Sequence, residues 1–324
     1  MSIQQRTVAA DDADIRLDRW FRRHFPALTQ GALQKMCRTG QVRVDGKRVE
    51  TNTRLAGGQV VRIPPMPDAP LAKPAAPRVK PDDEAMLRDA ILYSDGSVIV
   101  LNKPPGLPVQ GGPGISRHLD GMLEALRFDA EQKPRLVHRL DRDTSGVLLL
   151  ARTPSSAAKL AAAFRSRDTH KTYWAVVVGR PHPLEGRINM SLAKLGGTPH
   201  GERVVPDEGP ESAHAITDYR VIDTALKSAA LLEMNPVTGR THQLRVHAAS
   251  ALGTPILGDG KYGEEEAHIE GLSRQLHLHA RAISLPHPEG GTLEVAAPLP
   301  PHMAETFKFF GFDVPKTPAA WRKR

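Results

Sequence analysis

A run of polar and ionisable side chains stands directly before a strongly apolar segment near the middle of the chain. Residues 138–146 read His-Arg-Leu-Asp-Arg-Asp-Thr-Ser-Gly, and large aliphatic residues occupy 147–150. The aliphatic run predicts a strand buried on both faces of a sheet. Charged groups beside such a strand cost free energy unless they are paired or in use, and loops that enter rigid strands often carry catalytic groups. Asp141 and its neighbours are therefore candidates for catalysis, with a charged surface turn as the plainer alternative.

Two further segments offer side chains that could work with this loop. Residues 171–179 read as a strand in which Tyr173 shares a face with Ala175 and Val177. Residues 236–247 read Pro-Val-Thr-Gly-Arg-Thr-His-Gln-Leu-Arg-Val-His, and Thr241 is placed to cap a helix that continues through Leu252.

The remaining elements of this part of the chain follow from apolar periodicity and turn residues. We expect a strand pair within 91–101, a helix at 155–165 capped by Thr153 or Ser155, a loop-dominated hairpin region at 184–212, a strand pair around 216–221 and 231–232, a loop at 258–263 and a strand region at 276–285.

The first part of the chain is small and basic. Leu17, Trp20 and Phe21 share one face of a predicted helix, and Thr29 is a plausible cap for a second helix that ends at Gly40. Residues 42–49 alternate around Asp-Gly, which predicts a tight hairpin. The cations concentrate in these elements, namely Arg16, Arg19, Arg22, Arg23, Lys35, Arg38, Arg43, Lys47 and Arg48. An ordinary solvated face is the alternative to an RNA-binding surface.

This segment resembles, over nearly its whole length, the small alpha-L RNA-binding domain first seen in the fourth small-subunit ribosomal protein. Residues 16–21 and 42–49 match the family's RLDRWL-like and VRVNGKRV-like strings, with Asp-Gly in place of the commoner Asn-Gly. The resemblance implies that the nine cations bind RNA. After it, residues 65–84 are rich in proline and predict a semi-rigid, extended linker.

The central loop and its strand, HRLD-x-x-TSG followed by an apolar run, resemble the central motif of the RluA-type pseudouridine synthases. The segment around Asn-Lys-Pro-Pro-Gly at 102–106 resembles the family's first motif. Residues 239–247, with the downstream loop at 258–263, match its third motif, and Gln-Gly-Gly at 110–112 looks most like the RluC branch. With the basic segment included, the resemblance covers residues 13 to 312, roughly nine-tenths of the chain.

The resemblance implies the chemistry. The bond between ribose and uracil N1 breaks, the base turns, and it is rejoined through C5, without metal or cofactor. Asp141 becomes the catalytic carboxylate, which either adds to the anomeric carbon or removes a ribose proton. It must be ionised, so a cation should lie against it and lower its pKa, with Arg245 as first choice and Arg240 as second. Tyr173 packs on the uracil and can help remove the C5 proton.

The motifs also imply supporting roles. Arg139 is the candidate for filling the space that the extruded uridine leaves in the RNA, whereas Asp143 is interpreted as structural. The side chains expected to support the active site are His138, Leu140, Thr144, Ser145, Gly146, Arg240, His242 and Leu244.

Composition agrees with an RNA partner and narrows the other possibilities. The net charge is +8 with a pI near 9.7, which favours a polyanion. The single cysteine excludes an internal disulfide framework, and no segment is long and apolar enough to suggest a membrane span. His242 with His247 and His277 with His279 suggest a metal only weakly, because no cysteine or metal-binding helix motif accompanies them. We expect a cytoplasmic monomer without metal or cofactor.

Together these observations predict an α+β protein. Residues 13–64 form the alpha-L RNA-binding domain, and residues 65–84 form the linker. Residues 85–312 form a pseudouridine synthase domain with a mixed, mainly antiparallel sheet flanked by helices and loops, and residues 313–324 form a basic tail. The expected substrate is 23S ribosomal RNA. Transfer RNA, a non-catalytic role in ribosome assembly and a base-excising glycosidase remain alternatives.

Overall fold

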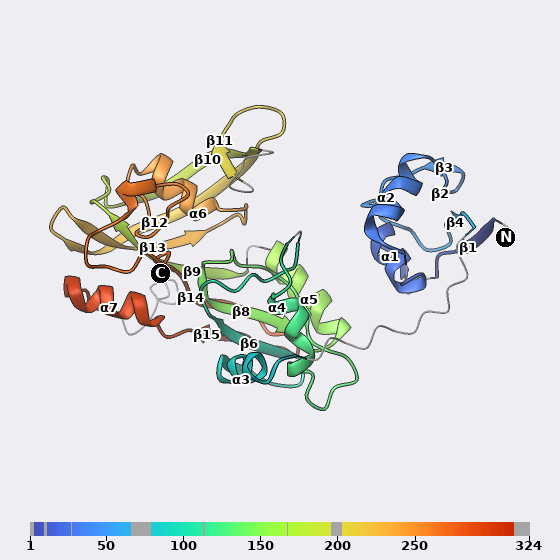
Figure 1. Ribbon diagram of the computed structural model, residues 1–324, viewed down its shortest axis with the longest axis horizontal. Coiled ribbons are helices and arrows are strands. Elements are labelled where there is room, and N and C mark those ends of the chain that lie inside the picture. Colours follow the sequence, from blue (N-terminus) through green and yellow to red (C-terminus); the bar gives the residue numbers. More distant parts are fainter. Residues whose placement is uncertain are drawn as a thin grey trace. The chain divides into compact units, whose positions relative to one another are not determined.

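The computed structural model describes residues 3–9, 12–26, 28–65, 79–112, 114–166, 168–195 and 203–313. The chain divides into two compact units, Met1–Arg78 and Val79–Arg324, which we call the N-terminal and C-terminal units (Figure 1). Most of the predicted linker and all of the predicted basic tail after residue 313 lie outside the described residues.

The N-terminal unit packs two helices against a small antiparallel sheet. The helices are α1 (Leu17–His24) and α2 (Gln30–Arg38). The strands are β1 (Gln4–Thr7), β2 (Arg43–Val44), β3 (Lys47–Arg48) and β4 (Val60–Ile63), in the sheet order β1-β4-β2-β3.

The core of this unit forms as the apolar spacing predicts. Leu17, Trp20 and Phe21 are buried together on α1, and the lone cysteine, Cys37, is buried on α2. The Thr29 hydroxyl accepts a hydrogen bond from the Ala32 N–H and caps α2. Residues 45 and 46 have φ angles of 49° and 76°, so the chain turns there in the left-handed region that the Asp-Gly pair favours.

The described residues of the C-terminal unit form an 11-stranded sheet. Its strands are β5 (Ile91–Ser94), β6 (Val98–Lys103), β7 (Arg135–Leu136), β8 (Ser145–Ala151), β9 (His170–Val178), β10 (Glu185–Leu195), β11 (Arg203–Pro206), β12 (Ala213–Ala225), β13 (Ala229–Pro236), β14 (Leu278–Pro286) and β15 (Thr292–Ala296). The main order is β11-β10-β12-β13-β9-β14-β8-β6-β5, with β15 paired to β14 and β7 paired to β8. Among the described strands of this sheet every pairing is antiparallel except that of β14 with β8, so the predicted mixed, mainly antiparallel sheet is confirmed.

Helices and short helical turns flank this sheet (Figure 1). They are α3 (Pro81–Asp89), α4 (Leu119–Met122), η2 (Leu123–Leu126), α5 (Pro154–Arg165), α6 (Gln243–Val246), the π-helical turn η3 (His247–Ala251), η4 (Glu264–Ala267) and α7 (Pro301–Phe310). A capping box between Thr153 and Ser156 begins α5, as its sequence predicts.

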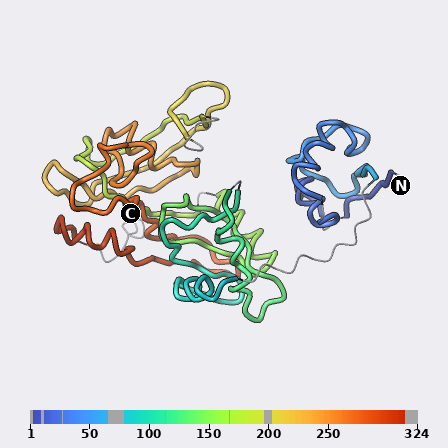
Figure 2. The backbone as a smooth tube through the Cα atoms, in the orientation of Figure 1, coloured from blue at the N-terminus to red at the C-terminus, as the bar shows by residue number. Residues whose placement is uncertain are grey.

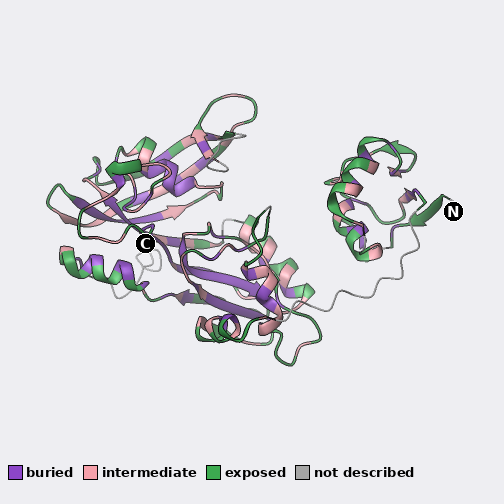
Figure 3. Cartoon of the chain, in the orientation of Figure 1, coloured by how far each residue is buried: buried purple, intermediate pink, exposed green. Residues whose placement is uncertain are grey.

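The centre of the sheet is buried on both faces (Figure 3). Along β8, Leu148 and Leu150 pack into one apolar cluster, whereas Leu149 packs into another on the opposite face. Along β9, Tyr173 packs on the same side as Ala175, as the alternation predicts. A sheet sandwiched in this way provides a rigid support for the loops at its edge.

The pairing of β14 with β8 joins segments that are far apart in sequence (Figure 2). Gly146 lies at this contact with a φ of 106°, and a Cβ atom there would stand 2.2 Å from the carbonyl oxygen of Ala280. Only glycine fits that combination of backbone angle and space. The Ser145 hydroxyl is within hydrogen-bonding distance of His279 Nδ1, at 2.9 Å, which holds the same junction.

Three expectations about local structure are wrong. The linker was expected to reach residue 84, but α3 begins at Pro81, because proline suits the first helical position and an acidic first turn follows. In the region 184–212 the expected hairpin is present, but its described residues lie mostly in the paired strands β10 and β11 rather than in loops. Thr241 does not cap a continuous helix, because His242 occupies the N-cap with a φ of 53° and the short α6 changes to a π-turn.

Candidate active site

Contacts with β8 and α5 hold the loop that precedes β8 in place. His138 Nε2 accepts a hydrogen bond from the Leu149 N–H at 2.8 Å, and the imidazole stacks on Phe164 with 4.5 Å between ring centroids. Burial and then the nearby Lys171 charge lower the pKa of His138 to about 3, so the imidazole is neutral. Leu140 is buried in the apolar cluster beneath the loop. The carboxylate that follows is therefore carried on a fixed piece of backbone.

Lys103 is the second support of this loop. The side chain is 1% exposed, and its ammonium donates hydrogen bonds of 2.8, 3.0 and 2.9 Å to the carbonyl oxygens of Pro104, Leu107 and Arg142. Burial lowers the pKa of Lys103 to about 7, opposed by the carboxylates of the loop. The buried ammonium of Lys103 thus links the backbone that follows β6 to the loop that precedes β8.

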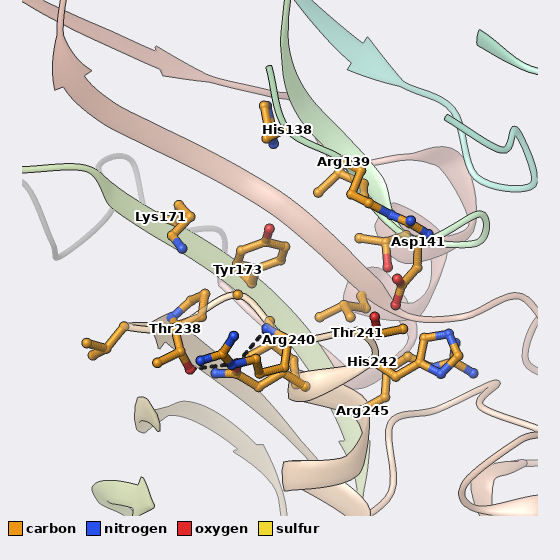
Figure 4. Close-up of a pocket in the computed structure, with 18 of the residues that line it drawn as sticks. His138, Arg139, Asp141, Lys171, Tyr173, Thr238, Arg240, Thr241, His242 and Arg245 are labelled. Carbon is orange, nitrogen blue, oxygen red and sulfur yellow. Dashed lines mark hydrogen bonds between the residues drawn. The ribbon is translucent and has the colours of Figure 1, made fainter. Parts of the chain in front are cut away.

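Asp143 and Arg139 differ from Asp141 in their surroundings. Asp143 Oδ1 accepts a hydrogen bond of 3.0 Å from its exposed neighbour Arg142, and Asp143 does not line the pocket described below. Arg139 is exposed, and its guanidinium has no hydrogen bond or ion pair with the described residues. It lines the pocket beside Asp141 (Figure 4).

Tyr173 reaches the same pocket from the middle of the sheet. It lies opposite Met234 of β13 and Ala280 of β14, so its backbone is fixed on both sides. Burial, and then the negative charge of Asp141, raise the pKa of the Tyr173 phenol. The neutral phenol is therefore the stable form, and the influence of Asp141 shows that the two side chains share one electrostatic environment.

Arg245 approaches from α6 but makes its ion pair with another residue. Its Nε and one terminal nitrogen donate hydrogen bonds of 2.8 and 2.6 Å to the carboxylate of Asp259, and both side chains are buried. Burial lowers the pKa of Arg245, but the hydrogen bonds to Asp259 and the charges of Asp259 and Asp141 outweigh it, so the pKa is raised. The first-choice cation is thus within electrostatic reach of Asp141, while its hydrogen bonds fix it to Asp259.

Arg240, the second choice, has a different environment. It is exposed, and its Nε donates a hydrogen bond of 3.0 Å to the carbonyl oxygen of His214. Its backbone N–H donates to Gln243 Oε1, which also accepts from the Thr238 hydroxyl. Arg240 therefore belongs to the turn that shapes the pocket wall.

His242 is held in the left-handed region beside this turn. Its Nδ1 lies 2.7 Å from the hydroxyl of Tyr262, and that hydroxyl also accepts a hydrogen bond from the Val204 N–H of β11. Burial lowers the pKa of His242 and exceeds the opposing effect of Asp141. The histidine is thus a neutral structural link between the third motif and the β10–β11 hairpin, which agrees with the expected supporting role.

These side chains enclose a pocket of about 810 Å³ (Figure 4). Its walls include Asp141, Tyr173 and Arg245, together with His138, Arg139, Leu140, Thr144, Arg240, His242 and Leu244 from the expected supporting set. Ser145 and Gly146 do not line it, because both are buried at the β8–β14 junction. Asp141 is the sole acidic side chain among the described residues that line the pocket.

Sequence reasoning missed three side chains of this site. Lys103 and Asp259 lie within quoted motifs, but their partners come from other segments of the chain. Lys171, which precedes Tyr173 on β9, also lines the pocket. A signal for Asp259 was present, because it stands in the Gly-Asp-Gly-Lys-Tyr-Gly string at 258–263.

Comparison with known proteins agrees with this geometry. A model of the family described as RNA pseudouridylate synthase matches residues 97–250, and a model of the S4 domain matches residues 15–61. Ribosomal large subunit pseudouridine synthase C of Yersinia pestis is 39% identical over 303 residues, which cover 92% of each chain. The chain belongs to the RNA pseudouridylate synthase family.

Other relatives and solved structures support the membership. RNA pseudouridine synthase 4, mitochondrial, of Arabidopsis thaliana is 34% identical and covers 89% of this chain and 78% of its own length. The structure of Human RNA Pseudouridylate Synthase Domain Containing 4 superposes with a TM-score of 0.61 and 30% identity, over 72% of this chain and 97% of the human chain. This RNA pseudouridine synthase is therefore an isomerase that converts uridine to pseudouridine in RNA.

The S4 domain carries the cations expected to bind RNA. Arg19, Arg22, Lys35, Arg38, Lys47 and Arg48 are exposed, and their side chains have no hydrogen bond or ion pair within the described part of the chain. Arg16 pairs with Asp18, Arg23 pairs with Asp12, and Arg43 donates to two backbone carbonyls. Arg16, Arg23 and Arg43 also contribute positive charge, but their side chains are held by these contacts within the domain.

Proposed function

We propose that this enzyme isomerises uridine in ribosomal RNA of the large subunit, with Asp141 as the catalytic carboxylate. The observation that carries the assignment of the site is the convergence of Asp141, Tyr173 and Arg245 on one pocket from three separate segments. The relatives in Yersinia pestis and Rickettsia conorii, 39% and 38% identical, bear the name ribosomal large subunit pseudouridine synthase C. This supports large-subunit RNA as the substrate over transfer RNA.

The roles of the three side chains follow from their surroundings. Asp141 acts at the anomeric carbon, where its carboxylate either adds or removes a ribose proton. The uracil lies against Tyr173. Because the pKa of its phenol is raised, Tyr173 acts as a neutral hydroxyl that relays a proton rather than as a phenolate base. Arg245, fixed by Asp259, supplies positive charge to the same pocket as Asp141.

Arg139 takes part in extrusion of the uridine. A long planar cation that is exposed beside the catalytic loop can stack on the bases that the target leaves behind. Its contribution should be larger on folded RNA than on an unstructured oligonucleotide.

The glycosidase alternative receives no support from the site. Hydrolysis of a glycosidic bond normally uses two carboxyl groups and a placed water, but Asp141 is the sole acidic group among the described pocket residues. Isomerisation keeps the uracil in the RNA and needs no second carboxylate.

The direct test is to incubate the purified enzyme with unmodified transcripts of 23S RNA, 16S RNA and transfer RNA. Pseudouridines are then mapped by chemical labelling and primer extension. We expect new pseudouridines at defined positions of 23S RNA. Modification of transfer RNA alone would contradict the substrate assignment, and release of free uracil would contradict isomerisation.

A further inference from the structure

Lys171 is a cation in the active-site pocket that none of the assigned roles uses. It lies on β9 two residues before Tyr173, so both side chains project from the same face of the strand. Lys171 is half-buried and lines the pocket, as does Tyr173. Figure 4 shows Tyr173 between Lys171 and Asp141.

The ammonium of Lys171 has no partner among the described residues. The backbone carbonyl of Lys171 accepts a hydrogen bond from Asn235, but no hydrogen bond or ion pair of its side chain occurs there. Burial lowers the pKa of Lys171. A half-buried charge that the protein leaves unpaired is unfavourable, and such groups concentrate at functional sites.

The neighbouring histidine does not neutralise or share this charge. His138 Nε2 already accepts the Leu149 N–H, and the charge of Lys171 helps to lower the pKa of His138. Protonation of His138 would break that hydrogen bond and place two cations together. His138 therefore contributes no positive charge beside Lys171.

The pocket thus has two electrostatic ends. The charge of Asp141 raises the pKa values of Tyr173 and Arg245, whereas burial alone acts on the pKa of Lys171. A uridine whose ribose lies at Asp141 and whose base packs on Tyr173 would direct the far edge of the base toward Lys171. That edge carries the carbonyl oxygens of uracil.

We propose that Lys171 stabilises the negative charge that uracil acquires when the glycosidic bond breaks. This inference rests on the proposed function. The N1–C1′ bond breaks with its electron pair on N1, and the charge spreads to O2 and O4. The ammonium donates a hydrogen bond to one of these oxygens and keeps its proton, and it can serve the other oxygen after the base turns. C5 then forms its bond to C1′ with an electron pair of the uracil anion, while C1′ gives up its bond to Asp141 or, in the deprotonation route, the ribose regains its proton. The C5 proton passes to a base and N1 takes up a proton, so the product is neutral pseudouridine.

A contact with an RNA phosphate is the competing role for a basic side chain here. Arg165 suits that role better, because it is exposed at the pocket whereas Lys171 is half-buried in the same lining. Phosphates remain hydrated outside the pocket, whereas the base enters it. Arg165 therefore provides a matched control, since it is a pocket cation that lies at the surface.

The test compares RNA carrying uridine with RNA carrying 5-fluorouridine at the modified position. Fluorine withdraws electrons and makes uracil a better leaving group, so cleavage needs less help from a cation. Single-turnover loss of the N-glycosidic bond is measured with wild type, Lys171→Met, Lys171→Gln, Lys171→Arg and Arg165→Met at saturating enzyme. Affinity for each RNA is measured at several salt concentrations.

We expect Lys171→Met and Lys171→Gln to lose about 100-fold in rate on uridine RNA, comparable to removal of one charge-stabilising donor. Their loss on 5-fluorouridine RNA should be clearly smaller, with affinity and salt dependence unchanged. Lys171→Arg should recover most of the rate. Arg165→Met should weaken binding and reduce the salt slope by about one, and any loss of rate should be equal on the two RNAs.

The ratio of the two rates is measured on one preparation, so it does not depend on how much of a variant is folded. Equal losses on both RNAs would overturn the proposal, as would a defect of Lys171→Met confined to affinity and salt slope. Absence of wild-type activity on every RNA would instead contradict the proposed function.

Discussion

The two units of this protein use positive charge in opposite ways. In the S4 domain, residues such as Arg22, Lys35 and Lys47 are exposed, and water and salt screen their charges. In the catalytic unit, Lys103 and Arg245 are buried, and each is fixed by named acceptors. Exposed charge attracts RNA without fixing its geometry, whereas buried charge positions the catalytic groups. Substitution of the exposed cations should therefore weaken RNA binding, whereas substitution of the buried charges should lower the catalytic rate.

The largest effect among the buried charges is expected at Asp259. Asp259→Asn leaves the guanidinium of Arg245 buried without its counter-charge and frees it to move toward Asp141. The single-turnover rate should fall about 100- to 1000-fold, while affinity for RNA changes little. Rapid-quench kinetics and filter binding check both parts. A variant with normal rate would show that the Arg245–Asp259 pair is structural only.

Lys103→Met should have the next largest effect. The variant loses the three hydrogen bonds that join the first motif to the catalytic loop, so the rate should drop by about 10- to 100-fold and the melting temperature should fall. Lys159→Met is the matched control, because Lys159 is exposed and donates to a single carbonyl, that of Pro288. If the two variants behave alike, Lys103 has no special role in positioning the loop.

Deletion of residues 1–64 tests the exposed cations of the S4 domain. The truncated enzyme should bind RNA more weakly and with a shallower salt dependence, because many cations directed at phosphates are gone. Its rate on saturating RNA should be close to that of the full chain. Binding that is equal at every salt concentration would contradict the assigned role of the S4 domain.

Acidic pH should moderately lower the folding stability of the C-terminal unit. Burial lowers the pKa of His138 to about 3 and the pKa values of His247, His277 and His279 to about 4, against 6.5 in the unfolded chain. Between pH 6.5 and 4 the unfolded chain binds protons that the folded chain does not, so stability falls as pH falls. The melting temperature of the truncated enzyme should decrease steadily from pH 7 to 5. A constant value would show that these histidines are not held neutral.

The elements that could be predicted from sequence depend on local patterns. The aliphatic run at 147–150, the alternation around Tyr173, the Thr153 cap and the Asp-Gly hairpin each express a preference of a few adjacent residues, and the structure contains all four. The motifs also identified the pocket-lining residues Asp141 and Arg245.

The elements that could not be predicted depend on distant partners. Lys103 donates a hydrogen bond to the carbonyl of Arg142 in a distant segment. Asp259 accepts a hydrogen bond from Arg245, although the sequence predicts only a loop around Asp259. The left-handed His242 contradicts the local preference for a helix capped by Thr241, because its ring is held by Tyr262. Lys171 carries no local signal, since its unpaired state is visible only in three dimensions.

The central claim is that Asp141 is the carboxylate that acts at the anomeric carbon. The most direct test is tritium release from 5-tritiated uridine in 23S RNA by Asp141→Asn, measured together with RNA affinity and melting temperature. The amide keeps the shape of the side chain but cannot act as nucleophile or base, so we expect no detectable release with affinity and stability close to wild type. Appreciable turnover by this variant would contradict the account.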